Sequence, residues 1–168
     1  PHDGLAMLTW LATTHPSPDH EAWQENSPSG SAYYGGDMVA WGINTTRGRA
    51  ALALAQRLAR HQVEIPAMEA TVRLLCNDAS LGVRSCAAHT VDAIARHNPD
   101  LGIELAEELV SHEDARLLGA EPVVGLLNVL GHSHAARVMP ILERMVRSDD
   151  PAAQEAGAAR LASLIRFS

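Results

Sequence analysis

Three neighbouring residues carry the side chains most often used in nucleophilic catalysis. Ser85 and Cys86 precede His89 by four and three residues, and residues at that spacing share one face of a helix, where an imidazole could activate a hydroxyl or a thiol. Cys86, however, lies among Ala residues at a position where a helix normally packs a small side chain. We therefore favour a buried structural cysteine. The sequence has no G-x-S-x-G, H-E-x-x-H or Gly-rich phosphate motif, and we expect no enzymatic activity.

Histidines and cysteines are the next candidates, as metal ligands. His132 and His134 form a His-x-His pair in a predicted polar turn, and His112 occurs in an earlier turn. A zinc site requires three or four converging ligands, and a His-x-His pair in a turn is more often solvated. Cys76 and Cys86 have no partner pair at zinc-finger spacing. We expect free buried thiols, as in a reducing cytosol, and neither a metal nor a cofactor.

The charged residues are distributed unevenly. The net charge is −7, and all thirteen basic residues are arginines, which excludes any lysine-based chemistry. A net negative charge argues against nucleic-acid binding over the whole surface. Residues 46–98 are nonetheless net basic, and residues 99–133 are strongly acidic. Four arginines fall on one predicted helix and could meet phosphate or an acidic partner, or could pair within the protein: Arg47, Arg49, Arg57 and Arg60.

Aromatic residues are rare, and three of the six fall between residues 33 and 41. Tyr33 and Tyr34 precede two glycines, and tyrosines of this kind often anchor interfaces. We predict that they form an exposed contact. Trp41 and Ile43 are instead expected to pack back as a cap over the first helices of the fold.

Apolar periodicity predicts an all-α fold. A first helix is expected over residues 4–14, followed by a long Pro- and Gly-rich loop over residues 16–44. Residues 1–45 and 46–168 are therefore interpreted as an N-terminal helix with its loop and as a helical array, within a single domain. The helices of the array are predicted over residues 46–61, 66–76, 81–97, 101–112, 123–132, 135–148 and 152–166.

A repeat is visible in the turns between these helices. Asp78, Asp114 and Asp149 each follow a helix of similar type, at separations of 36 and 35 residues. Such periods are typical of helical-repeat proteins. Three units are also about the minimum for a stable array.

Two segments resemble HEAT or armadillo-like repeats. In RLLCNDASLGVRSCAAHTVDAI, an aspartate in the turn precedes Val83-Arg84 and small residues at the helix crossing. MPILERMVRSDDPAAQEAGAARLASL is similar, although Glu155 stands where the family usually has arginine, which leaves the Asp-to-Arg ladder in question there. The resemblance covers residues 46–167 and implies a right-handed superhelical α-α solenoid of HEAT-like hairpins.

The same resemblance implies a protein-binding or scaffolding module. The second helix of each unit would build the concave face, with Arg84, His89, Asp92 and Arg96 as candidates to line it. The segment GINTTRGRAALALA is similar to segments of large bacterial HEAT-containing proteins, including signalling NTPases of the STAND type, although this chain has no Walker motif. Because the chain begins at Pro1 without an initiator Met, we expect it to be part of a larger cytoplasmic bacterial protein without membrane contact.

Two alternatives stay open. HEAT-like glycosylases bind DNA, so the Arg47–Arg60 helix could serve a nucleic-acid-binding module. The pairs His20-Glu21 and His112-Glu113 resemble the iron-binding His-Glu pairs of HEAT-type hydroxylases, which require several such pairs to converge. We favour an unidentified protein partner. Its predicted contacts are Tyr33, Tyr34, Arg47, Arg49, Arg84, His89 and Arg96.

Overall fold

The protein is all-α in the part of the chain that the structure describes. The computed structural model covers residues 2–17 and 37–166, and these ranges contain no strand. The prediction of an all-helical fold is confirmed. The elements are α1 (His2–Thr13), α3 (Met38–Ile43), α4 (Thr46–Arg60), the 3-10 turn η2 (Gln62–Glu64), α5 (Ile65–Cys76), α6 (Leu81–Ala95), α7 (Pro99–Leu109), α8 (Arg116–Gly119), α9 (Glu121–Gly131), α10 (Ala135–Val146) and α11 (Pro151–Arg166).

Capping residues explain where the helices begin. The side chain of Thr45 accepts a hydrogen bond from the Gly48 N–H at the start of α4, and Ser80 accepts one from Val83 at the start of α6. Asn98 caps α7, whose first residue is Pro99. Each cap satisfies a backbone donor that has no partner within its helix.

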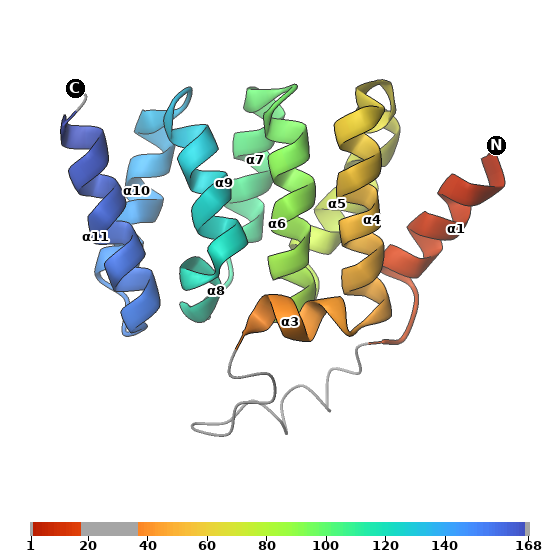
Figure 1. Cartoon of the computed structure of the whole chain (residues 1–168), viewed down its shortest axis with the longest axis horizontal. Coiled ribbons are helices and arrows are strands. Elements are labelled where there is room, and N and C mark those ends of the chain that lie inside the picture. The colour runs from red at the N-terminus through yellow and green to blue at the C-terminus, as the bar shows by residue number, and fades with distance from the viewer. Residues whose placement is uncertain (1, 18–36, 167–168) are drawn as a thin grey trace.

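The longer helices form two layers (Figure 1). The front layer contains α4, α6, α9 and α11 side by side, and the back layer contains α5, α7 and α10. Each back-layer helix is followed along the chain by a front-layer helix that packs against it, with the short α8 inserted between α7 and α9. Helix α1 packs on α4 and α5 at one end of the row.

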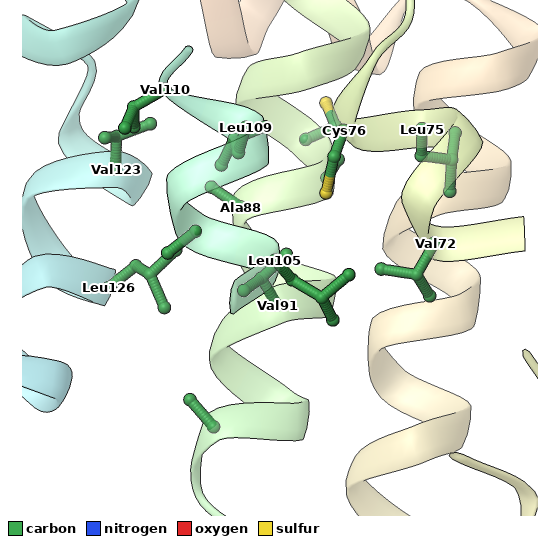
Figure 2. Close-up of a cluster of buried hydrophobic side chains, with 14 of the residues drawn as sticks. Val72, Leu75, Cys76, Ala88, Val91, Leu105, Leu109, Val110, Val123 and Leu126 are labelled. Carbon is green, nitrogen blue, oxygen red and sulfur yellow. The ribbon is translucent and has the colours of Figure 1, made fainter. Parts of the chain in front are cut away.

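The core lies between these layers. Figure 2 shows Leu75 from α5, Val91 from α6, Leu105 from α7 and Leu126 from α9 converging in one apolar cluster. All four side chains are essentially inaccessible to solvent. Each back-layer helix buries one face, whereas α6 is buried on almost every side. Helix α6 is therefore the central element of the described fold.

The turns that carry the repeated aspartates all lie on one side of the molecule, which we call the lower edge from its place in Figure 1. Asp78 lies between α5 and α6, Asp114 between α7 and α8, and Asp149 between α10 and α11. The helix bounds agree with the predicted ones to within a few residues.

The main difference from the sequence prediction is α3, which replaces the last part of the expected loop. Asp37 caps this short helix by accepting hydrogen bonds from Val39 and Ala40. Helix α3 packs across the N-terminal ends of α4 and α6 at the lower edge (Figure 1).

Three glycines allow α3 to lie this close. A Cβ atom at Gly42 would overlap the carbonyl oxygen of Gly82 on α6, and one at Gly48 on α4 would overlap that of Gly42. A Cβ atom at Gly82 would overlap the ring of Trp41. Trp41 therefore packs onto the start of α6, and the backbones of α3, α4 and α6 meet directly.

Within residues 2–17 and 37–166, no helix is both long enough and apolar enough to cross a membrane.

Candidate partner-binding face

Helix α6 presents a single stripe to solvent. His89 and the cap residue Arg96 are exposed and Asp92 is half-buried, whereas most other residues of the helix are buried by α4, α5, α7 and α9. Residues 89, 92 and 96 follow one helical face. Arg96 donates from Nε to Asp92 Oδ2 at 2.9 Å, and this contact raises the pKa of Arg96. The predicted contacts His89 and Arg96 are therefore accessible and adjacent.

The helices on either side of α6 extend this stripe into a wider surface. Exposed residues of α4 recur at helical spacing on one face of that helix, and α9 contributes a shorter stripe. We call the combined surface the front face. It consists of Ala53, Gln56 and Arg60 from α4, of His89, Asp92 and Arg96 from α6, and of Gly125 and Asn128 from α9.

Helix α3 limits the front face at the lower edge. Ser85 lies one turn before His89 on the same face of α6, yet it is fully buried because α3 packs over it. Arg49 on α4 is exposed, and its Nε donates to the carbonyl oxygen of Ile43 at the end of α3 at 2.9 Å. The predicted contact Arg49 thus lies at the border of the front face.

The back layer has a different surface, because its charges pair between helices. Arg73 on α5 forms ion pairs with Glu104 and Glu108 on α7, and with Glu69 on its own helix. Arg137 on α10 pairs with Glu107 on α7 at 2.5 Å. Three of the acidic residues of α7 are therefore paired with arginines from both neighbouring helices.

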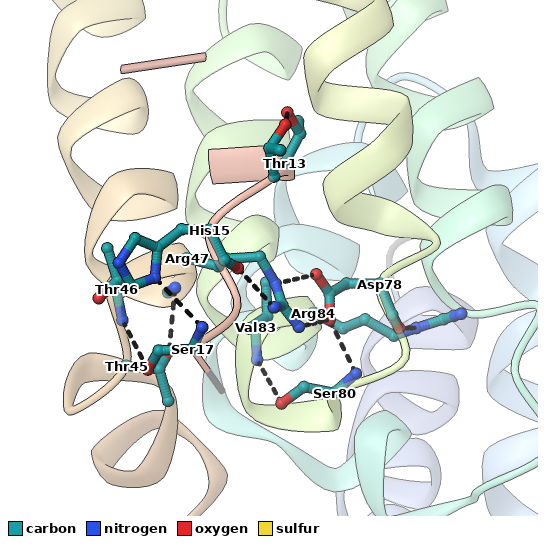
Figure 3. A network of polar contacts seen from close by, with 12 residues as sticks. Thr13, His15, Ser17, Thr45, Thr46, Arg47, Asp78, Ser80, Val83 and Arg84 are labelled. Carbon is teal, nitrogen blue, oxygen red and sulfur yellow. Dashed lines mark hydrogen bonds and ion pairs between the residues drawn. The ribbon is translucent and has the colours of Figure 1, made fainter. Parts of the chain in front are cut away.

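Two of the predicted contacts, Arg47 and Arg84, belong to a polar network inside the lower edge (Figure 3). Arg47 donates from Nε to Asp78 Oδ2 at 2.8 Å and from Nη1 to His15 O at 2.9 Å. The Asp78 carboxylate also accepts from the Ser80 N–H at 2.8 Å. The side chains of Arg47 and Asp78 are only 13% and 9% exposed. This network joins α4 to the α5–α6 turn.

Arg84 extends this network to α7. It donates from Nε to Asp78 O at 2.6 Å and from Nη1 to Leu109 O at 3.3 Å. Arg84 is 7% exposed, and burial lowers its pKa while Asp78 opposes that shift. The expectation that Arg84 lines an open face does not fit this burial. Its guanidinium instead satisfies backbone carbonyls in a place where an unpaired carbonyl would destabilise the fold.

The Ser85–Cys86–His89 set lacks the geometry of a nucleophilic site. The Ser85 hydroxyl donates to Gly82 O at 2.8 Å, and Cys86 is fully buried. Burial raises the pKa of the Cys86 thiol to about 12, so the thiolate needed for attack is scarce at neutral pH. His89 faces solvent. These positions fit the interpretation of a buried structural cysteine.

The described histidines do not form a metal site with acidic residues or thiols. Across the described ranges, no three His, Cys, Asp or Glu side chains are close enough together to hold a metal ion. His112 Nδ1 accepts a hydrogen bond from the Asp114 N–H at 3.0 Å. His134 Nε2 lies 3.4 Å from Asp100 Oδ1. The pair His20-Glu21 lies outside the described residues, as do Tyr33 and Tyr34, so these predictions stay untested.

Sequence reasoning did not single out Gln56, Gly125 or Asn128 as part of the front face. Only the packing of α4, α6 and α9 in one layer brings them together. Helical spacing could have identified residues 56 and 60 with residue 53 as one polar stripe of α4. No comparable signal exists for Gly125 and Asn128, which lie in an apolar helix.

Comparison of this chain with protein-family models, curated proteins and solved structures finds no match.

Proposed function

We propose that this chain is a non-catalytic protein-binding module, built as a right-handed solenoid of HEAT-like hairpins, and that its front face holds the partner. The paired units would be α5 with α6, α7 with α9, and α10 with α11. The recurrence of Asp78, Asp114 and Asp149 in turns on the lower edge supports this assignment. A further support is the Arg47–Asp78 ion pair, which joins α4 to the turn of the first unit.

The observation that carries the functional proposal is the contrast between the two layers. The back layer holds its charges in ion pairs between α5, α7 and α10. On the front face, Gln56 and Arg60 are exposed beside the stripe of α6, and Gly125 leaves the neighbouring α9 without a side chain at that point. An exposed arginine beside a flat surface of small residues suits binding of an extended segment of another protein.

Variants of the front face test the proposal. We expect Arg60→Glu combined with Arg96→Glu to abolish capture of a specific protein from an extract of the source cells. The matched control is Arg137→Glu, an exposed arginine of the back layer, which should leave capture unchanged. Equal losses in both variants would contradict a role of the front face.

Nucleic-acid binding by α4 is the second candidate, and the geometry weakens it. Arg47 pairs with Asp78, and Arg57 pairs with Glu64 at 2.5 Å. Two of the four arginines of this helix are thus engaged within the protein. If the chain instead retains duplex DNA with an affinity that falls steeply as salt increases, this second candidate replaces the first.

A further inference from the structure

A cavity opens at the lower edge of the C-terminal half, away from the front face. Its volume is about 700 Å³, within the range of small-molecule sites. It lies between the α7–α8 turn and the C-terminal half of α10, and Leu118 and Pro140 supply part of its apolar wall. Three nitrogen-bearing side chains line it: His112, Arg144 and Arg147.

Arg144 is the central group of this cavity. Its Nη2 donates to the carbonyl oxygen of Val110 at the end of α7, which fixes the guanidinium in place. Among the residues that the structure describes, no carboxylate pairs with Arg144, and burial alone lowers its pKa. A guanidinium has five N–H donors, so most of those of Arg144 are available to a ligand in the cavity.

His112 and Arg147 add donors on either side. Because His112 Nδ1 accepts from the Asp114 N–H at 3.0 Å, a neutral ring carries its proton on Nε2. Burial and the nearby Arg84 lower the pKa of His112, which favours this neutral form. Arg147 is held only by an exposed contact of 3.2 Å to Glu143 on its own helix. Such a surface pair is weak and can exchange Glu143 for a ligand.

We propose that this cavity binds a small anion through a carboxylate or phosphate group, with Arg144 as the main contact and with His112 and Arg147 as supporting donors. A planar guanidinium matches the paired oxygens of either group. Glu113, Glu143 and Asp149 also line the cavity. Their charge repels anions of any size, so a ligand must be held by the direct hydrogen bonds of Arg144 and not by the overall charge of the cavity, which disfavours a nucleic-acid backbone.

Titration of the intact chain with two probes tests this site. Inorganic phosphate and succinate are added separately, and binding is followed by calorimetry and by the NMR signals of the arginine side chains. We expect saturable binding of at least one probe, and the tighter of the two identifies the group that the site prefers. Absence of saturable binding by both would overturn the proposal.

Two arginines of the same helix separate a specific site from general charge effects. We expect Arg144→Gln to weaken binding of the preferred probe by at least about tenfold. Arg137→Gln removes the same charge two turns earlier on α10, outside the cavity, and should leave affinity unchanged. Equal losses in the two variants would overturn the proposal.

A conservative variant guards against a folding defect. Arg144→Lys keeps the positive charge and loses the paired donors. We expect it to fold, to melt within a few degrees of the original chain, and to bind the probe with an affinity between those of the original chain and Arg144→Gln. Unchanged affinity in Arg144→Lys would contradict recognition by the guanidinium.

Discussion

The two halves of the lower edge are built differently, although each places an aspartate in a turn between helices. In the N-terminal half, the Asp78 side chain is only 9% exposed and pairs with Arg47 on α4, and the Asp78 carbonyl oxygen accepts a hydrogen bond from Arg84. In the C-terminal half, Asp114 pairs with Arg116 only two residues away, and that arginine is 45% exposed. A long-range pair closes the first half, whereas a local pair leaves the second half open.

This difference explains where a cavity can form. Helix α3 covers the ends of α4 and α6 and excludes solvent from the N-terminal half of the edge. In the C-terminal half, the short α8 packs on the N-terminal part of α11, and the cavity beside Arg144 lies between the α7–α8 turn and α10. An aspartate in a turn can therefore serve stability in one half of the edge, whereas the turn in the other half borders a cavity.

The largest expected difference is in the stability lost when Asp78 or Asp114 is replaced. Asp78→Asn removes the charge that pairs with Arg47, whose side chain is only 13% exposed, and should reduce the free energy of unfolding by about 3 kcal/mol. Asp114→Asn removes an exposed pair and should reduce it by less than about 1 kcal/mol. Urea denaturation of both variants measures these values. Similar losses would show that the two halves of the edge are not different.

A pair of glycines tests the closed half next. Gly42→Ala places a methyl group against Gly82 O and within 2.6 Å of Cys86 Sγ, and should destabilise the protein by about 1–3 kcal/mol. The control is Gly125→Ala on α9, where the added methyl meets no described atom within 4 Å apart from its chain neighbours and the backbone of its own helix. It should be neutral or stabilise the helix by up to about 1 kcal/mol. Thermal melting followed by circular dichroism compares them, and a neutral Gly42→Ala would contradict direct contact between α3 and α6.

The thiol of Cys86 reports whether α3 stays docked. It lies beneath Gly42, and burial raises its pKa to about 12. In a Cys76→Ser background, we expect modification by a thiol reagent at pH 8 to be slow and to become faster in Gly42→Ala, because the added methyl displaces α3. The Gly125→Ala control should keep the slow rate. Rapid modification of the chain with Gly42 intact would show that α3 does not close this edge.

The smallest expected effect concerns pH. Hydrogen bonding to Arg116 holds the pKa of Asp114 below its ordinary value. The folded pKa is therefore lower than that of the unfolded chain, which is about 3.9. The stabilisation is present above the unfolded value and is lost as the pH falls through the folded one. The difference in unfolding free energy between the original chain and Asp114→Asn should vanish in strong acid, and a difference that grows toward low pH would contradict this pairing.

Much of the fold could be predicted from the sequence because local signals specify it. The helices predicted over residues 46–61 and 81–97 begin where expected, directly after the capping residues Thr45 and Ser80, whereas α7 begins at Pro99, two residues before its predicted start. Helix α3 was not predicted, because its six residues are too few to show a helical period of apolar residues and they include Gly42. Its position depends on a contact with Gly82, which is about 40 residues away in the sequence.

The candidate site was less predictable for the same reason. Arg47, Arg84 and Arg96 look equivalent in the sequence, yet the first two are engaged by Asp78 and by backbone carbonyls inside the lower edge. Only Arg96 lies on the front face. The packing of neighbouring helices decides whether an arginine side chain is exposed to solvent or pairs with an aspartate in a turn. No local sequence pattern encodes that outcome.

The central claim is that the front face, and not the back layer, meets a protein partner. The most direct measurement places a photoreactive benzoylphenylalanine at position 89 on α6 and, separately, at position 104 on α7, where the native Glu104 side chain is 52% exposed. After irradiation in the source cells, we predict one adduct of defined mass from position 89, lost when Arg60→Glu is added, and no such adduct from position 104. The same adducts from both positions, or none from position 89, would contradict the account.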